Sequence, residues 1–348
     1  ARKGAEELAE ALEGIGAALS VGIGWASTTV GLTCHADRLE PAMALLAEVV
    51  REPAFDEGEV GLARDRRMAG FQQRRMSPGG LADDCFAHAV FSDDSPYHRP
   101  VGGSAPAVAA LDAEAVRAWW RDRYAPASAT LVAVGDVDPG EMETLAGRTL
   151  GDWANPAGGG PAMAEVRARR DEARIVVVDR PGAVQSEIRI GGVGVARSFP
   201  GTIPLRVFNG VLGGVFSSRL NLTLREKNGF TYGVRARFSQ RRAAGPFTIG
   251  AAVGTDVTAD AVRETHAELR TLLEEGPTPD EVASVRDYLA GVFPLQMETA
   301  SRIASRLSEQ VIYDLPDDYF STYRDRIRAV DVASAWEAGR TAMNPAGY

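Results

Sequence analysis

Two periods of hydrophobic and polar residues recur along the chain, and they occur in a similar order in each half. Alternation at every second residue predicts strands with one buried face, whereas apolar residues three and four apart predict helices. The alternating stretches are residues 18–27, 28–36, 129–137, 230–240 and 247–254, and the helical stretches include residues 6–16, 41–50, 207–229 and 259–276. Because strands come in adjacent pairs with helices grouped between them, the pattern predicts an α+β fold with antiparallel sheets.

Two pairs of similar segments indicate a duplication within the chain. LDAEAVRAWWRDRYAPA resembles VDVASAWEAGRTAMNPA, with Asp112 matching Asp331 at an offset of 219 (331 − 112). FDEGEVGLARDRRMAGF resembles PDEVASVRDYLAGVF, with Gly70 matching Gly291 at an offset of 221 (291 − 70). Alanine-rich helices also resemble one another by chance, but two pairs in the same order favour duplication. We therefore predict two domains of similar fold.

A stretch rich in glycine and proline separates the two halves. DWANPAGGGPAM, from Asp152 to Met163, has no apolar period and is typical of an exposed linker. We place the boundary there and predict an N-terminal domain at residues 1–160 and a C-terminal domain at residues 161–348.

Charge and composition argue against several classes of partner. The 348 residues carry 38 Lys+Arg against 47 Asp+Glu, a formal charge of −9, so no basic excess exists to displace the counterions of nucleic acid. No apolar run reaches the roughly 18 residues that a membrane-spanning helix needs, and no secretion signal opens the sequence. Cys34 and Cys85 lack C-x-x-C spacing and are expected to be small, buried side chains. Two cysteines without a disulfide framework favour a protein from a reducing compartment. We expect a soluble, cytoplasmic protein without a membrane or nucleic-acid partner.

The four histidines show no spacing typical of a metal site on a helix. They are His35, His88, His98 and His266, and none has another histidine three or four residues away, so neither H-E-x-x-H nor H-x-x-E-H occurs. The phosphate-binding loop G-x-x-x-x-G-K-[ST] and the nucleophile elbow G-x-S-x-G are also absent from the sequence. The residues therefore predict no metal ligand and no cofactor in this chain, and His98 is expected to lie in a loop.

Arg225 and Tyr232 stand seven residues apart in LREKNGFTYGV, where a helix is expected to end and a strand to begin. The pattern leaves two interpretations open. Tyr232 shares a strand face with Val234 and Ala236, which favours a core position. Arg225, close to a helix-ending Gly229, is typical of a solvated charge at a helix end. Alternatively, a phenolic hydroxyl and a guanidinium are donors that can stabilise a negative oxygen in a reaction.

Several segments together resemble one family of enzymes. SSRLNLTLREKNGFTYGV, PGAVQSEIRIGGVGVARSFP, GAEELAEALEGIGA, PAFDEGE and ATLVAVGDVDP resemble the insulinase or pitrilysin family of zinc peptidases, the inverzincins, and in particular its mitochondrial-processing-peptidase-like branch. The resemblance covers essentially the whole chain. It implies two homologous α+β domains, each an antiparallel sheet packed with helices, that form one half of a clamshell closing over a peptide.

The resemblance also assigns roles to residues. In this family the catalytic half carries H-x-x-E-H and a further glutamate ligand, and the facing half supplies an arginine and a tyrosine seven residues later. Arg225 and Tyr232 match that pair. Gly70, however, stands where the glutamate ligand is expected, and Ala63 replaces a second glutamate typical of the site. A zinc peptidase needs three protein ligands and an open position for water, so this chain is expected to lack the catalytic zinc.

These matches and departures predict the non-zinc subunit of a heterodimeric metallopeptidase, inactive alone. The zinc is expected in a homologous partner with H-x-x-E-H, and Arg225 and Tyr232 are expected to act on the peptide bound there. Two alternatives stay open. In the first alternative, the chain is a catalytically silent assembly subunit. In the second, it is an active zinc peptidase whose metal motif lies outside the sequence given.

Overall fold

Helices and short antiparallel sheets build this computed structural model, which confirms the predicted α+β class. It describes residues 3–154, 165–169, 172–344 and 347–348. Contacts divide the chain into two units, and neither is continuous in sequence. Unit 1 comprises Ala1–Gln72, Val101–Met163 and Met297–Asp314, and unit 2 comprises Gln73–Pro100, Ala164–Gln296 and Leu315–Tyr348. The predicted linker from Asp152 to Met163 lies largely outside the described residues, and the boundary there stays a prediction.

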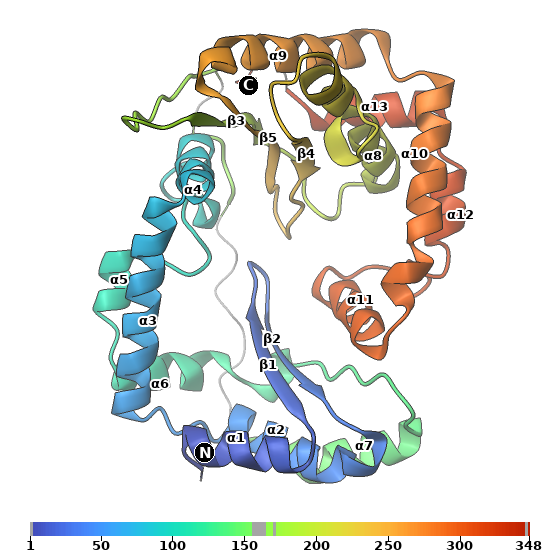
Figure 1. The fold of residues 1–348 in the computed structure, drawn as a ribbon. Coiled ribbons are helices and arrows are strands. Elements are labelled where there is room, and N and C mark those ends of the chain that lie inside the picture. Colours follow the sequence, from blue (N-terminus) through green and yellow to red (C-terminus); the bar gives the residue numbers. More distant parts are fainter. Residues whose placement is uncertain (1–2, 155–164, 170–171, 345–346) are drawn as a thin grey trace. The chain divides into compact units, whose positions relative to one another are not determined.

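Unit 1 consists of a hairpin and the helices around it (Figure 1). Its elements are α1 (Ala5–Gly14), β1 (Ala18–Ile23), β2 (Thr28–Thr33), a 3₁₀ turn (Ala36–Arg38), α2 (Leu39–Arg51), most of α3 (Glu57–Met76), α5 (Ala105–Ala109), α6 (Ala113–Arg123), a second 3₁₀ turn (Pro126–Ser128), α7 (Pro139–Leu150) and α11 (Ala300–Ile312). β1 and β2 pair antiparallel from Ala18 with Thr33 to Ile23 with Thr28.

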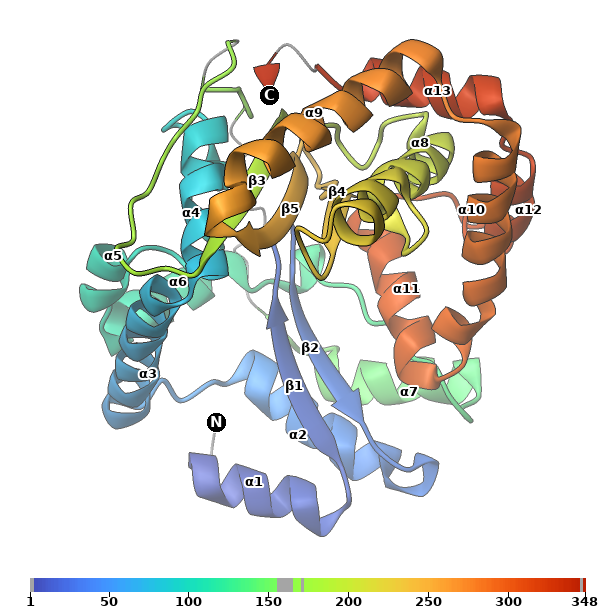
Figure 2. The same ribbon diagram turned by 45° about the horizontal axis from the view of Figure 1, so that its top comes forward.

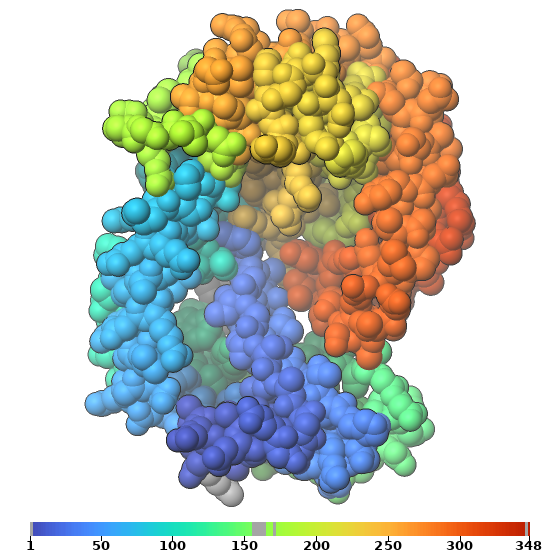
Figure 3. Space-filling model, in the orientation of Figure 1, coloured from blue at the N-terminus to red at the C-terminus, as the bar shows by residue number. Residues whose placement is uncertain are grey.

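The core of unit 1 lies where α2 and α7 meet the hairpin. Met43 and Leu46 of α2 pack with Met142 and Leu145 of α7, and partly buried side chains of the strands, including Leu32, close one side. The remainder of the hairpin is open to solvent, since five of the six β1 residues are exposed. The space-filling view shows the hairpin, in blue, uncovered on the visible face (Figure 3).

Unit 2 holds a three-stranded sheet in the order β3-β5-β4. Its elements are α4 (Pro78–Val90), a 3₁₀ turn (Pro96–His98), β3 (Gln185–Val193), α8 (Thr202–Asn209), a π-helical segment (Gly210–Gly214), a second π-helical segment (Asn221–Lys227), β4 (Val234–Phe238), β5 (Pro246–Gly254), a 3₁₀ turn (Thr255–Val257), α9 (Thr258–Glu275), α10 (Pro279–Val292), a 3₁₀ turn (Pro294–Met297), α12 (Tyr323–Arg328) and α13 (Val332–Ala342).

The central strand β5 carries the core of unit 2. It pairs antiparallel with both neighbours, so that Ile249 lies opposite Ile190 on β3 and Ala236 on β4. Every second β5 residue from Phe247 to Val253 is buried, as alternation predicts for a half-covered strand. The helix α9 crosses the sheet, and α8 lies beside β4 and packs against α13 (Figures 1 and 2).

The order of elements repeats in the two halves of the sequence. A hairpin, a 3₁₀ turn and two helices occur from β1 to α3 and again from β4 to α10. The 3₁₀ turns, α2 and α9, and α6 and α13 all begin 219 residues apart (255 − 36, 258 − 39 and 332 − 113). Asp112 and Asp331 each cap the following helix, at 2.8 Å from the backbone nitrogens of Ala115 and Ser334. This agreement supports the predicted duplication.

Each unit contains one α-helix whose neighbouring α-helices in the sequence belong to the other unit, and these two helices occupy corresponding places in the repeat. α4 follows α3 in the sequence but belongs to unit 2, and α11 follows α10 but belongs to unit 1. These helices begin and end 222 residues apart (300 − 78 and 312 − 90). This arrangement explains why neither unit is continuous, which the sequence pattern did not predict.

Three local predictions were wrong. Residues 129–137 form no strand, and none of the described strands pairs with them. Residues 207–229 do not form one helix, because the chain becomes extended at Val215 between the two π-helical segments. Just before this break, Gly213 packs closely against β4, since a Cβ at Gly213 would lie 2.9 Å from the backbone nitrogen of Ala236. Cys34 and Cys85 are free, as expected, but half-buried rather than buried.

Candidate functional site

Arg225 and Tyr232 lie on either side of a tight turn in unit 2. Arg225 belongs to the π-helical segment Asn221–Lys227, and Tyr232 precedes β4 by two residues. Gly229 between them has a φ of +64°, a left-handed conformation that glycine adopts without steric cost. It ends the helix as the sequence predicted, and the backbone nitrogen of Phe230 then donates to the Leu224 carbonyl at 2.8 Å.

A buried asparagine fixes the far end of this turn. The amide of Asn221 accepts a hydrogen bond from the Val234 backbone nitrogen at 3.1 Å and donates to the Val234 carbonyl at 3.0 Å. It also donates to the Val215 carbonyl and to the Ser218 hydroxyl. Because these partners lie before and after the π-helical segment, Asn221 ties the helix to the first residue of β4.

Two further contacts hold the segment that bears Arg225 and Tyr232. The Thr231 hydroxyl donates to the Ala252 carbonyl of β5 at 2.7 Å. The Arg219 guanidinium donates to both carboxylate oxygens of Glu281, at 2.6 and 2.8 Å, and to the Gly276 carbonyl. Burial raises the pKa of Glu281, but hydrogen bonds from Arg219 and Thr278 outweigh it, so that the pKa lies below its usual value. The carboxylate is therefore ionised at neutral pH, and the segment is anchored on both sides.

The Arg225 side chain is held close to the surface. Its guanidinium carbon lies 4.2 Å from the centre of the Phe216 ring, and Nη1 lies 2.9 Å from Glu226 Oε1. Phe216 itself is largely exposed. Nη1 itself is buried and makes no hydrogen bond, but the side chain as a whole is 31% exposed, so the stacked guanidinium keeps donors available for a ligand.

Tyr232 projects into solvent and is not part of the core. Its exposed fraction is 95%, whereas Val234 and Ala236 are exposed by 1% and 4%. The core interpretation of Tyr232 is therefore wrong: the alternating face begins at Val234, where β4 begins, and stops short of the tyrosine. A large aromatic side chain exposed on an anchored turn presents its hydroxyl outward, as a binding or reacting group would.

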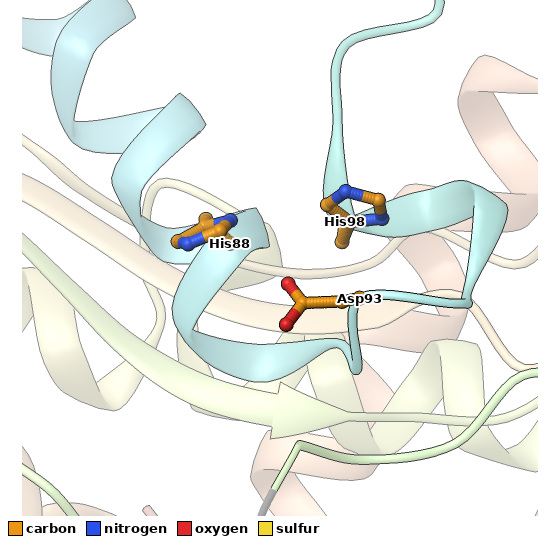
Figure 4. A group of neighbouring side chains, drawn as sticks. All are labelled: His88, Asp93 and His98. Atoms are coloured by element: carbon orange, nitrogen blue, oxygen red, sulfur yellow. The ribbon is translucent and has the colours of Figure 1, made fainter.

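The structure also brings together three residues that sequence reasoning missed. His88, Asp93 and His98 come from α4, the following turn and the 3₁₀ turn Pro96–His98, and their potential ligand atoms all lie within 4.8 Å of one another (Figure 4). Hydrogen bonding from Arg169, aided by the charges of Arg169 and both histidines, outweighs a small burial effect and lowers the pKa of Asp93. The signal in the sequence is the spacing H-x₄-D-x₄-H across a turn, which differs from the spacings of three or four residues typical of a metal site on a helix.

The positions where the resemblance expects glutamate ligands lie on α3. Ala63 is exposed, Gly70 is partly exposed, and none of the α3 residues, all of which the structure describes, is buried. A Cβ at Gly70 would meet no atom within 4 Å. Space for a longer side chain thus exists there, and the glycine is not required by packing.

The mixed α+β fold, the exposed Tyr232 on its anchored turn, and Gly70 and Ala63 on α3 agree with the class that the resemblance implies, a peptidase-like domain. Residues 110–289, just over half of the chain, match the family profile described as "Peptidase M16 inactive domain". The chain belongs to the peptidase M16 family. This confirms the resemblance to insulinase-like zinc peptidases.

Relatives and solved structures agree with this assignment. The chain is 26% identical over 317 residues to an uncharacterized zinc protease of Streptomyces coelicolor, covering 88% of this chain and 68% of that protein. It is 27% identical over 322 residues to an uncharacterized zinc protease of Mycobacterium tuberculosis, covering 88% and 69%. The crystal structure of a peptidase M16 inactive domain from Pseudomonas fluorescens matches with a TM-score of 0.90 and 25% identity, over 99% of this chain and 82% of that one.

No helix in the described ranges is long and apolar enough to cross a membrane.

Proposed function

We propose that this chain is the non-zinc subunit of a metallopeptidase, which pairs with a homologous zinc-bearing subunit and donates Arg225 and Tyr232 to the peptide bound there. The observation that carries the proposal is the Tyr232 side chain, 95% exposed on a turn that Asn221 and Thr231 hold in place. The inactive-domain match supports a chain that does not hold the catalytic zinc.

The chemistry of the two side chains fits peptide hydrolysis. When water attacks a peptide carbonyl, negative charge develops on the carbonyl oxygen, and donors fixed before the reaction stabilise it most. A zinc ion in the partner subunit would activate that water. The Tyr232 hydroxyl is one such donor, and the Arg225 guanidinium is a second with a permanent charge. Anchoring by Asn221 and Arg219 limits the reorganisation that closing over a substrate would require.

Tyr232→Phe tests the proposal in the complex with the zinc-bearing subunit. The change removes one hydroxyl and keeps the ring, so assembly and substrate binding should persist while kcat/KM falls about 10²-fold or more. Arg225→Ala should behave similarly, with an added rise in KM. The matched controls are Tyr288→Phe on α10, a tyrosine exposed by 54%, and Arg235→Ala on β4, both expected to be neutral.

Complex formation is checked separately by size-exclusion chromatography. If Tyr232→Phe assembles and cleaves peptide at the wild-type rate, the donor role is wrong. Loss of activity only when the whole subunit is removed would instead favour a catalytically silent assembly subunit. Chelator-sensitive cleavage by the isolated chain would favour an active zinc peptidase.

A further inference from the structure

Three potential metal ligands converge at the C-terminal end of α4. His88 lies in the last turn of this helix, Asp93 in the turn that follows, and His98 at the end of the 3₁₀ turn Pro96–His98. The imidazole rings of the two histidines lie 6.0 Å apart at 52° to one another. Figure 4 shows the Asp93 carboxylate directed into the space between the rings.

The backbone beneath these ligands is fixed by buried residues. Phe91 and Tyr97 are almost fully buried, and their rings meet edge to face at 5.8 Å. Ser95 is fully buried, and its hydroxyl accepts a hydrogen bond from the Tyr97 backbone nitrogen. Phe91 also bridges to Ala168, which ties the turn to another segment of unit 2. The loop that carries Asp93 and His98 is therefore constrained at both ends.

The orientation of His98 prepares one of its ring nitrogens for a metal. Nδ1 lies 2.6 Å from the Ser95 carbonyl oxygen, which only accepts hydrogen bonds, so Nδ1 carries the proton. In the neutral imidazole with the proton on Nδ1, Nε2 keeps its lone pair. Metal-binding histidines usually donate their second ring nitrogen to a carbonyl or carboxylate in this way, which fixes the tautomer and the ring.

Arg169 fixes the Asp93 carboxylate by hydrogen bonds, as the Ser95 carbonyl fixes the His98 ring. Its guanidinium donates to both Asp93 oxygens, and its Nε donates to the His88 carbonyl at 2.7 Å and the Phe91 carbonyl at 3.1 Å. Each carboxylate oxygen has a second lone pair, so this fork leaves acceptor sites for a cation. The positive charge of Arg169 weakens cation binding, but it also holds the carboxylate toward the two rings.

We propose that His88, Asp93 and His98 bind a divalent transition-metal ion of the zinc type. Two imidazoles and one carboxylate suit Zn²⁺, whereas Ca²⁺ and Mg²⁺ prefer oxygen ligands. The ligand atoms, within 4.8 Å of one another, need to approach to about 3.4 Å for tetrahedral bonds of about 2.1 Å. His88 and Asp93 are exposed, so side-chain rotation achieves this without moving the core. Three protein ligands leave a fourth position for water or a partner's side chain.

The test compares metal binding by the purified chain and by ligand variants, after chelation and dialysis. Zinc titration followed by calorimetry and elemental analysis should show one more bound zinc per chain for the wild type than for His98→Gln, Asp93→Asn or His88→Gln. Each variant should lose zinc affinity by at least roughly 100-fold. Removing a residue that only hydrogen-bonds to a metal ligand already lowers metal affinity roughly 10–100-fold. Cobalt substitution gives a second readout, because visible bands of low-symmetry Co²⁺ should vanish in the same variants.

His35→Gln is the matched control. His35 is exposed and lies 2.7 Å from Asp37, so it offers a histidine and a carboxylate without a second imidazole. It should bind zinc as the wild type does. If the wild type binds no more zinc per chain than the three ligand variants, the proposal is wrong. It is also wrong if His35→Gln loses as much zinc affinity as the ligand variants do. Circular dichroism melts in the absence of metal confirm that the variants fold. This inference does not depend on the proposed function.

Discussion

The two hairpins of the chain occupy equivalent places in the repeated order but differ in how they are packed. β4 and β5 alternate between buried and accessible residues, with Val234, Ile249 and Val253 almost fully buried. In the first half, five of six β1 residues are exposed and no β2 residue is buried. A shared order of elements therefore does not bring a shared core.

The first helices after the hairpins, α2 and α9, each bury four residues, but the second helices differ in the same direction as the hairpins. α10 begins with a capping box at Thr278 and buries Val282, Val285 and Ala290, whereas none of the 20 residues of α3 is buried. α3 is also the helix where the resemblance expects a glutamate ligand and where Gly70 stands. Packing is thus concentrated in the half that presents Arg225 and Tyr232, and a positioned site needs such support.

The largest difference in stability between the two hairpins is expected when the hydrogen bonds of Asn221 are removed. Asn221→Ala deletes four hydrogen bonds and leaves the buried backbone nitrogen and carbonyl of Val234 without the amide. Buried groups without partners are costly, so unfolding free energy should fall by about 2–4 kcal/mol. Urea titration monitored by circular dichroism measures the change.

Ser20→Ala in the first hairpin is the matched control. The Ser20 hydroxyl contacts the Gly31 carbonyl at 3.5 Å on an exposed strand, so its loss should change stability by less than about 0.5 kcal/mol. Equal effects of the two substitutions would show that the hairpins do not differ in the way their burial indicates.

A smaller difference is expected for two ion pairs. Glu281→Gln weakens the Arg219 fork and should cost about 1–2 kcal/mol, at the lower end for charge-assisted bonds because solvent still reaches the carboxylate. Glu298→Gln disrupts an exposed pair with Arg302 and should be almost neutral.

The Glu281 pair also predicts a pH dependence. The folded-state pKa of Glu281 is lowered below its usual 4.5, so its contribution is complete above that value and is lost as pH falls through the lowered pKa. The stability difference between wild type and Glu281→Gln should therefore shrink as pH falls below about 4.5. A difference that stays constant down to pH 2.5, or grows, would contradict this linkage.

Local chemistry made part of this fold predictable. Asp112 and Asp331 stand before helical patterns and cap α6 and α13, and Gly229 ends its helix at positive φ, because caps and glycine act through neighbouring backbone alone. The offset of 219 residues between the two repeats was also predictable, because it follows from matching Asp112 with Asp331. Such features need no knowledge of the packed molecule.

Features set by distant contacts were not predictable in this way. The alternating pattern includes Tyr232, but Asn221, 13 residues before Val234, fixes where β4 begins and leaves the tyrosine outside the core. The group of His88, Asp93 and His98 depends on Arg169, which lies 76 residues beyond Asp93. Sequence periodicity carries no information on such partners.

The smallest effect tests whether α3 is as free of packing as its burial indicates. A Cβ at Gly70 would meet no atom within 4 Å, so Gly70→Ala should add helix propensity without a clash and raise stability by about 0.5–1 kcal/mol. Gly291→Ala, its match on α10, also meets open space but lies one residue from the helix end, so a smaller gain is expected. Thermal melts of the two variants measure both changes. A loss of stability in Gly70→Ala would mean that α3 is packed against something in the folded protein, and the contrast with α10 would then be wrong.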